Sequence, residues 1–244
     1  MLSNIKYRLS CFADYSNIYY NSEKVDKIIS KFSDSILIPS ILPEADSVGI
    51  VRNGILLTDQ TKLFSIAIMG GRIDATLVAG NKEGFEPEKI DEIKHQLINS
   101  FNSVYDVFSE SIQDAYRMAW YTEYVYFEID DNHIISYKDK FAKPVDCIKG
   151  IETTEFSTKY SAIDLAEIDE KNEKYNLITN INRIQPGSGG FYDRVNGYMI
   201  GFDINTHQNS KKNRINMMNF EKYVDTAIEF QEKLKRGFID ELII

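Results

Sequence analysis

Cysteine, histidine and tryptophan are scarce in this chain of 244 residues, which holds 2 Cys, 3 His and 1 Trp. Cys11 and Cys147 lie far apart and form no CxxC pair, so we expect two buried free thiols in a protein of the reducing cytosol. His95, His133 and His207 have no Cys, His or carboxylate at metal-binding spacing, apart from the aspartates beside His133. The sequence therefore predicts no metal site and no cofactor.

Long apolar runs and an excess of basic charge are also lacking. No run approaches the roughly 20 residues that a membrane-spanning helix needs, and no signal peptide precedes the strand-like pattern near the N-terminus. We therefore expect a cytoplasmic protein with no membrane partner. With 28 Lys and Arg against 37 Asp and Glu, the formal net charge is −9. This balance counts against a nucleic-acid partner, because such binding needs a basic footprint that displaces phosphate counterions.

Aromatic residues are abundant instead, with 15 Tyr and 14 Phe, and these residue types favour β-strands. Runs that begin at Tyr7 and Tyr116 predict two long strands. Asn53-Gly54 and Gly70-Gly71 each stand between apolar runs and predict two tight hairpins, because Asn and Gly tolerate the positive φ of a tight turn. The pattern indicates an antiparallel sheet.

Two long amphipathic helices are predicted, one in each half of the chain. Between Phe85 and Phe108, apolar residues recur every three or four positions, which is the spacing of one helix face. The same spacing continues from Phe220 to the C-terminus, after an N-cap at Asn216 or Asn219. Each apolar stripe must lie against a partner, and the neighbouring antiparallel sheet is the obvious one.

The stretch Tyr116–Tyr124 repeats the stretch Tyr7–Tyr15 without a gap. The first Tyr, the Arg and the last Tyr are identical, and most other positions keep their chemical type. Later strands and the long helix can be matched in the same order, with longer loops in the second copy. We therefore expect an internal duplication, with a first α+β repeat at 1–114 and a second α+β repeat at 115–244.

The predicted fold class is α+β, built from two tandem repeats of antiparallel β-sheet followed by a long amphipathic helix. The repeats could form two separate two-layer domains. They could also share one larger sheet with both helices on the same face, in a saddle-like or helix-grip arrangement. The short link between Phe108 and Tyr116 favours adjacent copies with a shared interface.

Arg8 and Arg117 occupy equivalent positions in the two copies. One interpretation is a pair of guanidinium groups that bind an anion or a partner. The other, which we favour, is a structural ion pair kept by both copies, to Asp74 and Asp203. Both arginines are candidate interaction residues.

The glycine-rich stretch at 187–190 invites a phosphate-loop interpretation. Such loops need a helix directly after the glycines, whereas here Phe191, Tyr192 and Arg194 follow and then a strand. We instead expect a hairpin loop whose Phe191, Tyr192 and Arg194 are candidate interaction residues, because these types are enriched at interfaces. Acidic sets such as Asp146 and Glu155 with a nearby lysine lack nuclease spacing, and no Ser or Cys stands in a nucleophile elbow. No catalytic residue is therefore predicted.

Three segments near the C-terminus carry a family resemblance: Ile181-Asn182-Arg183-Ile184, the strand from Tyr198 to Thr206, and Phe238-Ile239-Asp240-Glu241-Leu242. With these segments the chain resembles an uncharacterised, sporadically distributed bacterial family of roughly 250-residue proteins. The resemblance implies an association with mobile elements or bacterial defence, and it implies no catalytic residues.

The sequence favours a non-enzymatic binding or interaction protein that acts through protein–protein contacts, with a protein partner or a second copy as a homodimer. Duplicated sheets leave edges and a concavity, which are common docking surfaces. The alternative hypothesis is an enzyme, or a nucleotide or small-ligand sensor, whose site lies between the two repeats.

Overall fold

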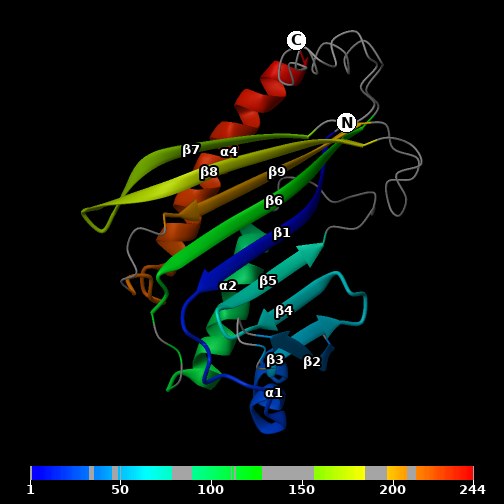
Figure 1. The fold of residues 1–244 in the computed structure, drawn as a ribbon, viewed down its shortest axis with the longest axis vertical. Coiled ribbons are helices and arrows are strands. Elements are labelled where there is room, and N and C mark those ends of the chain that lie inside the picture. The colour runs from blue at the N-terminus through cyan, green and yellow to red at the C-terminus, as the bar shows by residue number, and fades with distance from the viewer. Residues whose placement is uncertain are drawn as a thin grey trace.

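One antiparallel sheet runs through the computed structural model and lies in front of two long helices in Figure 1. Its nine described strands are β1 (Leu2–Phe12), β2 (Leu37–Ala45), β3 (Val51–Asp59), β4 (Phe64–Ile68), β5 (Arg72–Val78), β6 (Arg117–Phe127), β7 (Ser157–Ile168), β8 (Lys171–Ile184) and β9 (Gly197–Thr206). Their order across the sheet is β2-β3-β4-β5-β1-β6-β9-β8-β7. The helices are α1 (Ser22–Ile29), α2 (Ile90–Phe108) and α4 (Phe220–Ile243). The structure describes residues 2–32, 36–45, 49, 51–78, 90–110, 112, 114–127, 157–184, 197–207 and 213–243.

The two halves of the chain meet at the pairing of β1 with β6. Strand β1 pairs antiparallel with β5 on one side and with β6 on the other. The predicted α+β class is confirmed, and the halves share one sheet rather than forming two separate sheets. Among the described helices, none is long and apolar enough to cross a membrane.

The helix-facing side of the sheet is apolar because strand side chains alternate between the two faces. In β1, Tyr7, Leu9 and Cys11 are at most 2% exposed, and in β6 Met118 and Trp120 are completely buried. Burial of each large apolar side chain stabilises the fold by about 1.5–3 kcal/mol. The buried free thiol predicted at Cys11 is confirmed, whereas Cys147 lies outside the described residues.

Helix α2 covers the first half of the sheet and contacts β5 and β1. Its residues Ile93, Leu97, Phe101, Val104 and Phe108 are all buried. These residues form the apolar stripe predicted from the sequence, so that prediction is confirmed. The first turn predicted for this helix lies outside the described residues.

Helix α4 covers the second half of the sheet and contacts β6 and β9. It begins at Phe220, directly after Asn219, which is one of the two predicted N-caps, and it buries Phe220, Tyr223 and Ala227. The ring centroids of Phe101 and Phe220 lie 5.3 Å apart, so α2 and α4 also touch each other behind the sheet.

One of the two predicted hairpins is confirmed and the other is wrong. Gly70-Gly71 forms the turn between β4 and β5. Asn53-Gly54 lies inside β3 and not in a turn. A Cβ atom at Gly54 would lie 2.6 Å from the carbonyl oxygen of Ile68 and 3.3 Å from that of Leu42. The glycine is therefore needed for close approach of the neighbouring strands rather than for a positive φ.

Candidate interaction site on the uncovered sheet face

The face of the sheet opposite α2 and α4 carries no described helix, and we call it the uncovered face (Figure 1). Its centre is formed by the side chains of β1 and β6 that alternate with the buried apolar ones. Ser10 and Ala119 lie opposite each other at this centre and are 3% and 6% exposed. Longer side chains on both strands therefore surround and cover the middle of this face.

Arg8 and Arg117 each stack on an aromatic ring of the opposite strand. The guanidinium carbon of Arg8 lies 5.0 Å from the ring centroid of Tyr121, and that of Arg117 lies 4.7 Å from the centroid of Phe12. The β1–β6 register places Arg8 opposite Tyr121 and Arg117 opposite Phe12. Each stack contributes about 0.5–1 kcal/mol where it is exposed and up to about 2 kcal/mol where it is desolvated.

The ion pairs expected for these two arginines are not formed within the described part of the chain. Asp74 pairs with Arg72, with 3.0 Å between Nε and the carboxylate oxygen. Asp203 accepts a hydrogen bond from Asn205 Nδ2 at 2.9 Å. The sequence interpretation that we favoured for Arg8 and Arg117 is therefore wrong in this respect, because each guanidinium is held by an aromatic ring instead.

Three buried polar atoms near this centre have no hydrogen-bond partner among the described residues: Arg8 Nε, Arg117 Nε and Asp74 Oδ1. Asp74 is only 7% exposed, and it stands opposite Ser10 on the neighbouring strand. Leaving such a group buried and unpaired costs about 1–3 kcal/mol, so these atoms call for an explanation beyond folding.

Tyr121 is held in place by its own contacts. Its hydroxyl donates to Glu123 Oε2 at 2.5 Å, and burial and the Glu123 hydrogen bond raise the pKa of Tyr121 above its ordinary value. The hydroxyl lies 3.1 Å from the position of a Cβ atom at Gly201. Glycine at 201 therefore leaves room for the ring on which Arg8 stacks.

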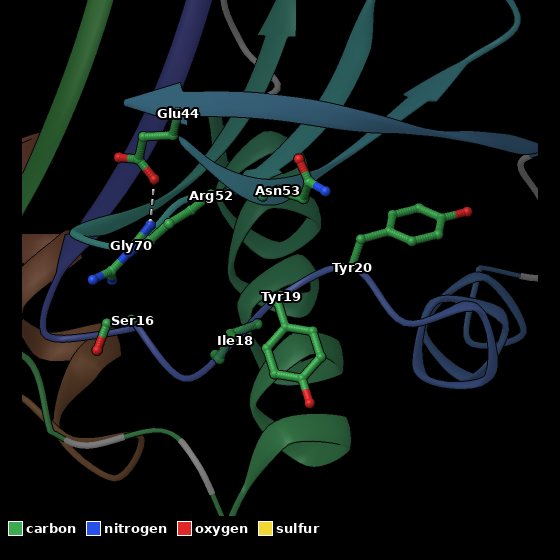
Figure 2. Close-up of a pocket in the computed structure, with 9 residues that line it drawn as sticks. Ser16, Ile18, Tyr19, Tyr20, Glu44, Arg52, Asn53 and Gly70 are labelled. Atoms are coloured by element: carbon green, nitrogen blue, oxygen red, sulfur yellow. Dashed lines mark hydrogen bonds between the residues drawn. The ribbon is translucent and has the colours of Figure 1, made fainter. Parts of the chain in front are cut away.

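A pocket of about 300 Å³ begins a few residues after Phe12, at the end of β1 (Figure 2). Its lining residues are Ser16, Ile18, Tyr19, Tyr20, Glu44, Arg52, Asn53, Gly54 and Gly70. Glu44 Oε2 accepts a hydrogen bond from the backbone N–H of Gly70 at 2.8 Å. Arg52 is exposed and extends towards Gly70, whereas the ring of Tyr19 points away from Glu44.

Asp14 borders the same hollow. Hydrogen bonds from Ser16 lower the pKa of Asp14, and the nearby positive charge of Arg52 lowers it further. All residues that line the hollow belong to the first predicted repeat, so it is not a cleft between the two repeats.

Several residues singled out in the sequence lie outside the described residues: Phe191, Tyr192, Arg194, His133, Asp146 and Glu155. His95 is exposed on α2, and His207 follows the end of β9. The described residues hold no group of three or more His, Cys, Asp or Glu side chains that could bind a metal ion.

Sequence reasoning missed the two ring partners, and it named Asp74 only as an ion-pair partner of the arginines. A signal was present, because an aromatic residue stands four positions after each arginine, at Phe12 and Tyr121. Antiparallel pairing of the two equivalent stretches in the observed register brings each arginine opposite the aromatic residue of the other stretch.

Comparisons with known proteins add no assignment. No protein-family model matches the chain, and no curated protein matches it.

Proposed function

We propose that this chain is a non-enzymatic binding protein that holds a segment of a partner protein against the uncovered face. The segment would lie over the cluster formed by Arg8, Arg117 and Asp74. The observation that carries the proposal is the presence of buried hydrogen-bonding groups without partners at this cluster. A bound segment would offset the cost of leaving them unpaired once the side chains that cover these atoms turn aside on binding.

The mixture of donors and an acceptor favours a polypeptide as the ligand. The two arginine groups are donors and Asp74 Oδ1 is an acceptor. A peptide main chain offers both carbonyl oxygens and N–H groups, so it can satisfy both kinds of group at once. A phosphate backbone offers only acceptors to these groups, and the net charge of −9 repels it.

We further propose that the chain consists of two repeats, at 1–114 and 115–244, in a saddle-like arrangement. From the centre outward, the strands follow the order β1-β5-β4-β3 on one side and β6-β9-β8-β7 on the other. Each series is followed along the chain by a long helix on the same face. The reciprocal stacks of Arg8 on Tyr121 and Arg117 on Phe12 agree with an approximate two-fold axis beside Ser10.

This arrangement suggests the size of the bound segment. Arg8 and Arg117 are separated by the four strand positions between Arg8 and Phe12, which corresponds to about 13 Å. An extended segment of about four residues spans that distance.

We also propose that the chain belongs with the bacterial family that its C-terminal segments resemble, in a mobile-element or defence context.

Affinity capture from a host lysate tests the proposed site. We expect the wild-type chain to recover a protein partner. The R8Q/R117Q variant should recover at least about tenfold less of that partner, because arginines at the centre of an interface often contribute much of the binding free energy. R236Q is the matched control, because Arg236 lies on the exposed side of α4. A partner recovered equally by all three chains would contradict the proposed site, and a chain that recovers nothing would contradict the function.

The pocket beside Arg52 is the observation that favours the rival function, a sensor or enzyme that binds a nucleotide or another small ligand. A thermal-shift screen with nucleotides and divalent metals separates the two functions. A ligand at a hundred times its dissociation constant stabilises the folded state by about 2.7 kcal/mol. A shift that R52Q abolishes would favour the rival function over the proposed one.

A further inference from the structure

The two outer strands of the described sheet differ in their ability to form main-chain hydrogen bonds with another strand. An edge strand presents unpaired N–H and C=O groups, which another strand can use. Strand β2 contains Pro39 and Pro43, which lack the N–H donor. Strand β7 contains no proline over its length from Ser157 to Ile168 and pairs with β8 on its inner side. The β7 edge is therefore the one suited to accept a further strand.

Strand β7 also exposes an apolar pair on the uncovered face. Ile163 is 59% exposed and Leu165 is 55% exposed. The other residues that β7 turns to this face are Ser157, Lys159, Ser161 and Glu167, and all four are exposed. A basic residue and an acidic residue thus flank the apolar pair at nearly equal distances from Ile163.

We infer that β7 pairs antiparallel with β7 of a second copy of this chain, about a two-fold axis next to Ile163. A two-fold axis perpendicular to the sheet keeps the uncovered faces of the two copies on the same side. It places Lys159 opposite Glu167 of the second copy, and the reverse pair follows by symmetry. Ile163 then faces its own equivalent, and Leu165 is diagonal to Ile163 of the second copy, within reach of it.

The charges on β7 select this register over its neighbours. Moving the axis from Ile163 to Asp164 would place two aspartates directly opposite each other, which is unfavourable. Moving it to Ala162 would place Lys159 opposite Leu165 of the second copy, and neither Lys159 nor Glu167 would have an opposite charge. Of these registers, the one centred on Ile163 gives both opposite-charge pairs and apolar contact between the two strands. The sequence of β7 therefore fits a second copy of β7 as its partner.

Helix α4 supports the same position for the added strand. Figure 1 shows α4 crossing behind β7 and continuing beyond it. The ring of Phe238 on this helix lies 5.9 Å from the ring of Tyr160 on β7. A strand added beside β7 would therefore lie next to the part of α4 that extends past the sheet.

Sedimentation equilibrium of the full chain over about 1 µM to 1 mM tests the inference. We expect a monomer–dimer equilibrium in the wild-type chain. K159E places acidic side chains opposite each other at two symmetric positions, so we expect the dissociation constant to rise on the order of tenfold or more. E167K should produce the same rise through opposed basic side chains, and the double variant K159E/E167K should restore the wild-type value.

The matched control is I38K, which adds a charge at an exposed isoleucine on the proline-containing edge strand β2. It should leave the dissociation constant unchanged. A chain that stays monomeric over the whole concentration range overturns the inference. A dimer that K159E and E167K leave unchanged, or that the double variant fails to restore, overturns it as well. Unaltered melting temperatures of the charge variants, measured at a concentration at which the wild-type chain is monomeric, show that the fold is retained.

Discussion

Helices α4 and α2 are anchored to the same face of the sheet by different kinds of polar group. On α4, Gln231 is completely buried. Its side-chain oxygen accepts from Trp120 Nε1 at 2.6 Å, and its side-chain nitrogen donates to the hydroxyl of Tyr124 at 2.9 Å. Both of these hydrogen bonds are buried. We call this set of three residues the α4 anchor.

On α2, the corresponding polar residue is Tyr105. Its hydroxyl lies 3.1 Å from the hydroxyl of Tyr15 and 3.6 Å from the Sγ atom of Cys11, and the site is partly buried. We call this set the α2 anchor. The α2 anchor consists of two phenol hydroxyls and a thiol, which can all titrate, whereas both bonds of the α4 anchor are made by an amide, which cannot. The difference teaches that the two halves of one sheet should respond differently to mutation and to pH.

A rise to alkaline pH should cause the largest loss of stability, and it acts through the α2 anchor. Burial raises the pKa of Cys11 to about 11, and burial also raises the pKa values of Tyr15 and Tyr105. Each group keeps its proton to a higher pH in the folded chain than in the unfolded chain. Stability is therefore fully present below about pH 9 and is lost as the pH rises through 10 and 11. Circular dichroism against pH measures this loss.

Thiol labelling in a C147S background provides the control for the alkaline transition. Cys11 should resist a thiol reagent until the circular dichroism signal is lost, because its thiol is buried and protonated. Reaction of Cys11 in a still-folded chain near pH 9 would contradict the prediction.

Replacement of Gln231 should have the next largest effect. Q231L removes the acceptor of the buried Trp120 Nε1 and the amide donor to the Tyr124 hydroxyl, so we expect a loss of about 2–4 kcal/mol in the free energy of unfolding. Urea denaturation measures the loss. Q96L replaces an exposed glutamine on α2 and should stay within about 0.5 kcal/mol of the wild type. Equal losses of stability from Q231L and Q96L would contradict the prediction that the α4 anchor stabilises the fold.

The smallest effect is expected from Y105F. It removes one hydroxyl from the α2 anchor and leaves Tyr15 and Cys11 near each other, so the loss should be about 1 kcal/mol or less. The same urea denaturation applies, with Y19F at an exposed tyrosine as the control. A loss from Y105F as large as that from Q231L would show that the two anchors are equivalent.

Local patterns in the sequence were enough to predict the two long helices. Residues such as Leu97 and Phe101 recur at helical spacing because one face of α2 must be buried. Gly70-Gly71 was also predicted correctly as a turn. At Gly54 the same kind of signal failed, because what decides the conformation there is the approach of β2 and β4 on either side. Contacts between strands distant in sequence are not encoded in the local pattern.

The candidate site was also predicted only in part, because local sequence patterns identify some of its residues but not their contacts. The match between the two stretches of sequence is enough to single out Arg8 and Arg117 as a pair. Their contacts with Tyr121 and Phe12 depend on the register of β1 against β6, which is a tertiary property. Asp74 could not be identified as an unsatisfied acceptor from the sequence, because hydrogen-bond partners become defined only when β5 is placed beside β1.

The position of β9 has a consequence for the order in which the chain folds. Strand β9 is the last described strand along the chain, yet it lies between β6 and β8 in the interior of the sheet. While the chain is being synthesised, β6 and β8 therefore keep open hydrogen-bonding edges until residues 197–206 emerge. Such late, non-local closure slows folding and leaves the nascent second half dependent on protection from aggregation.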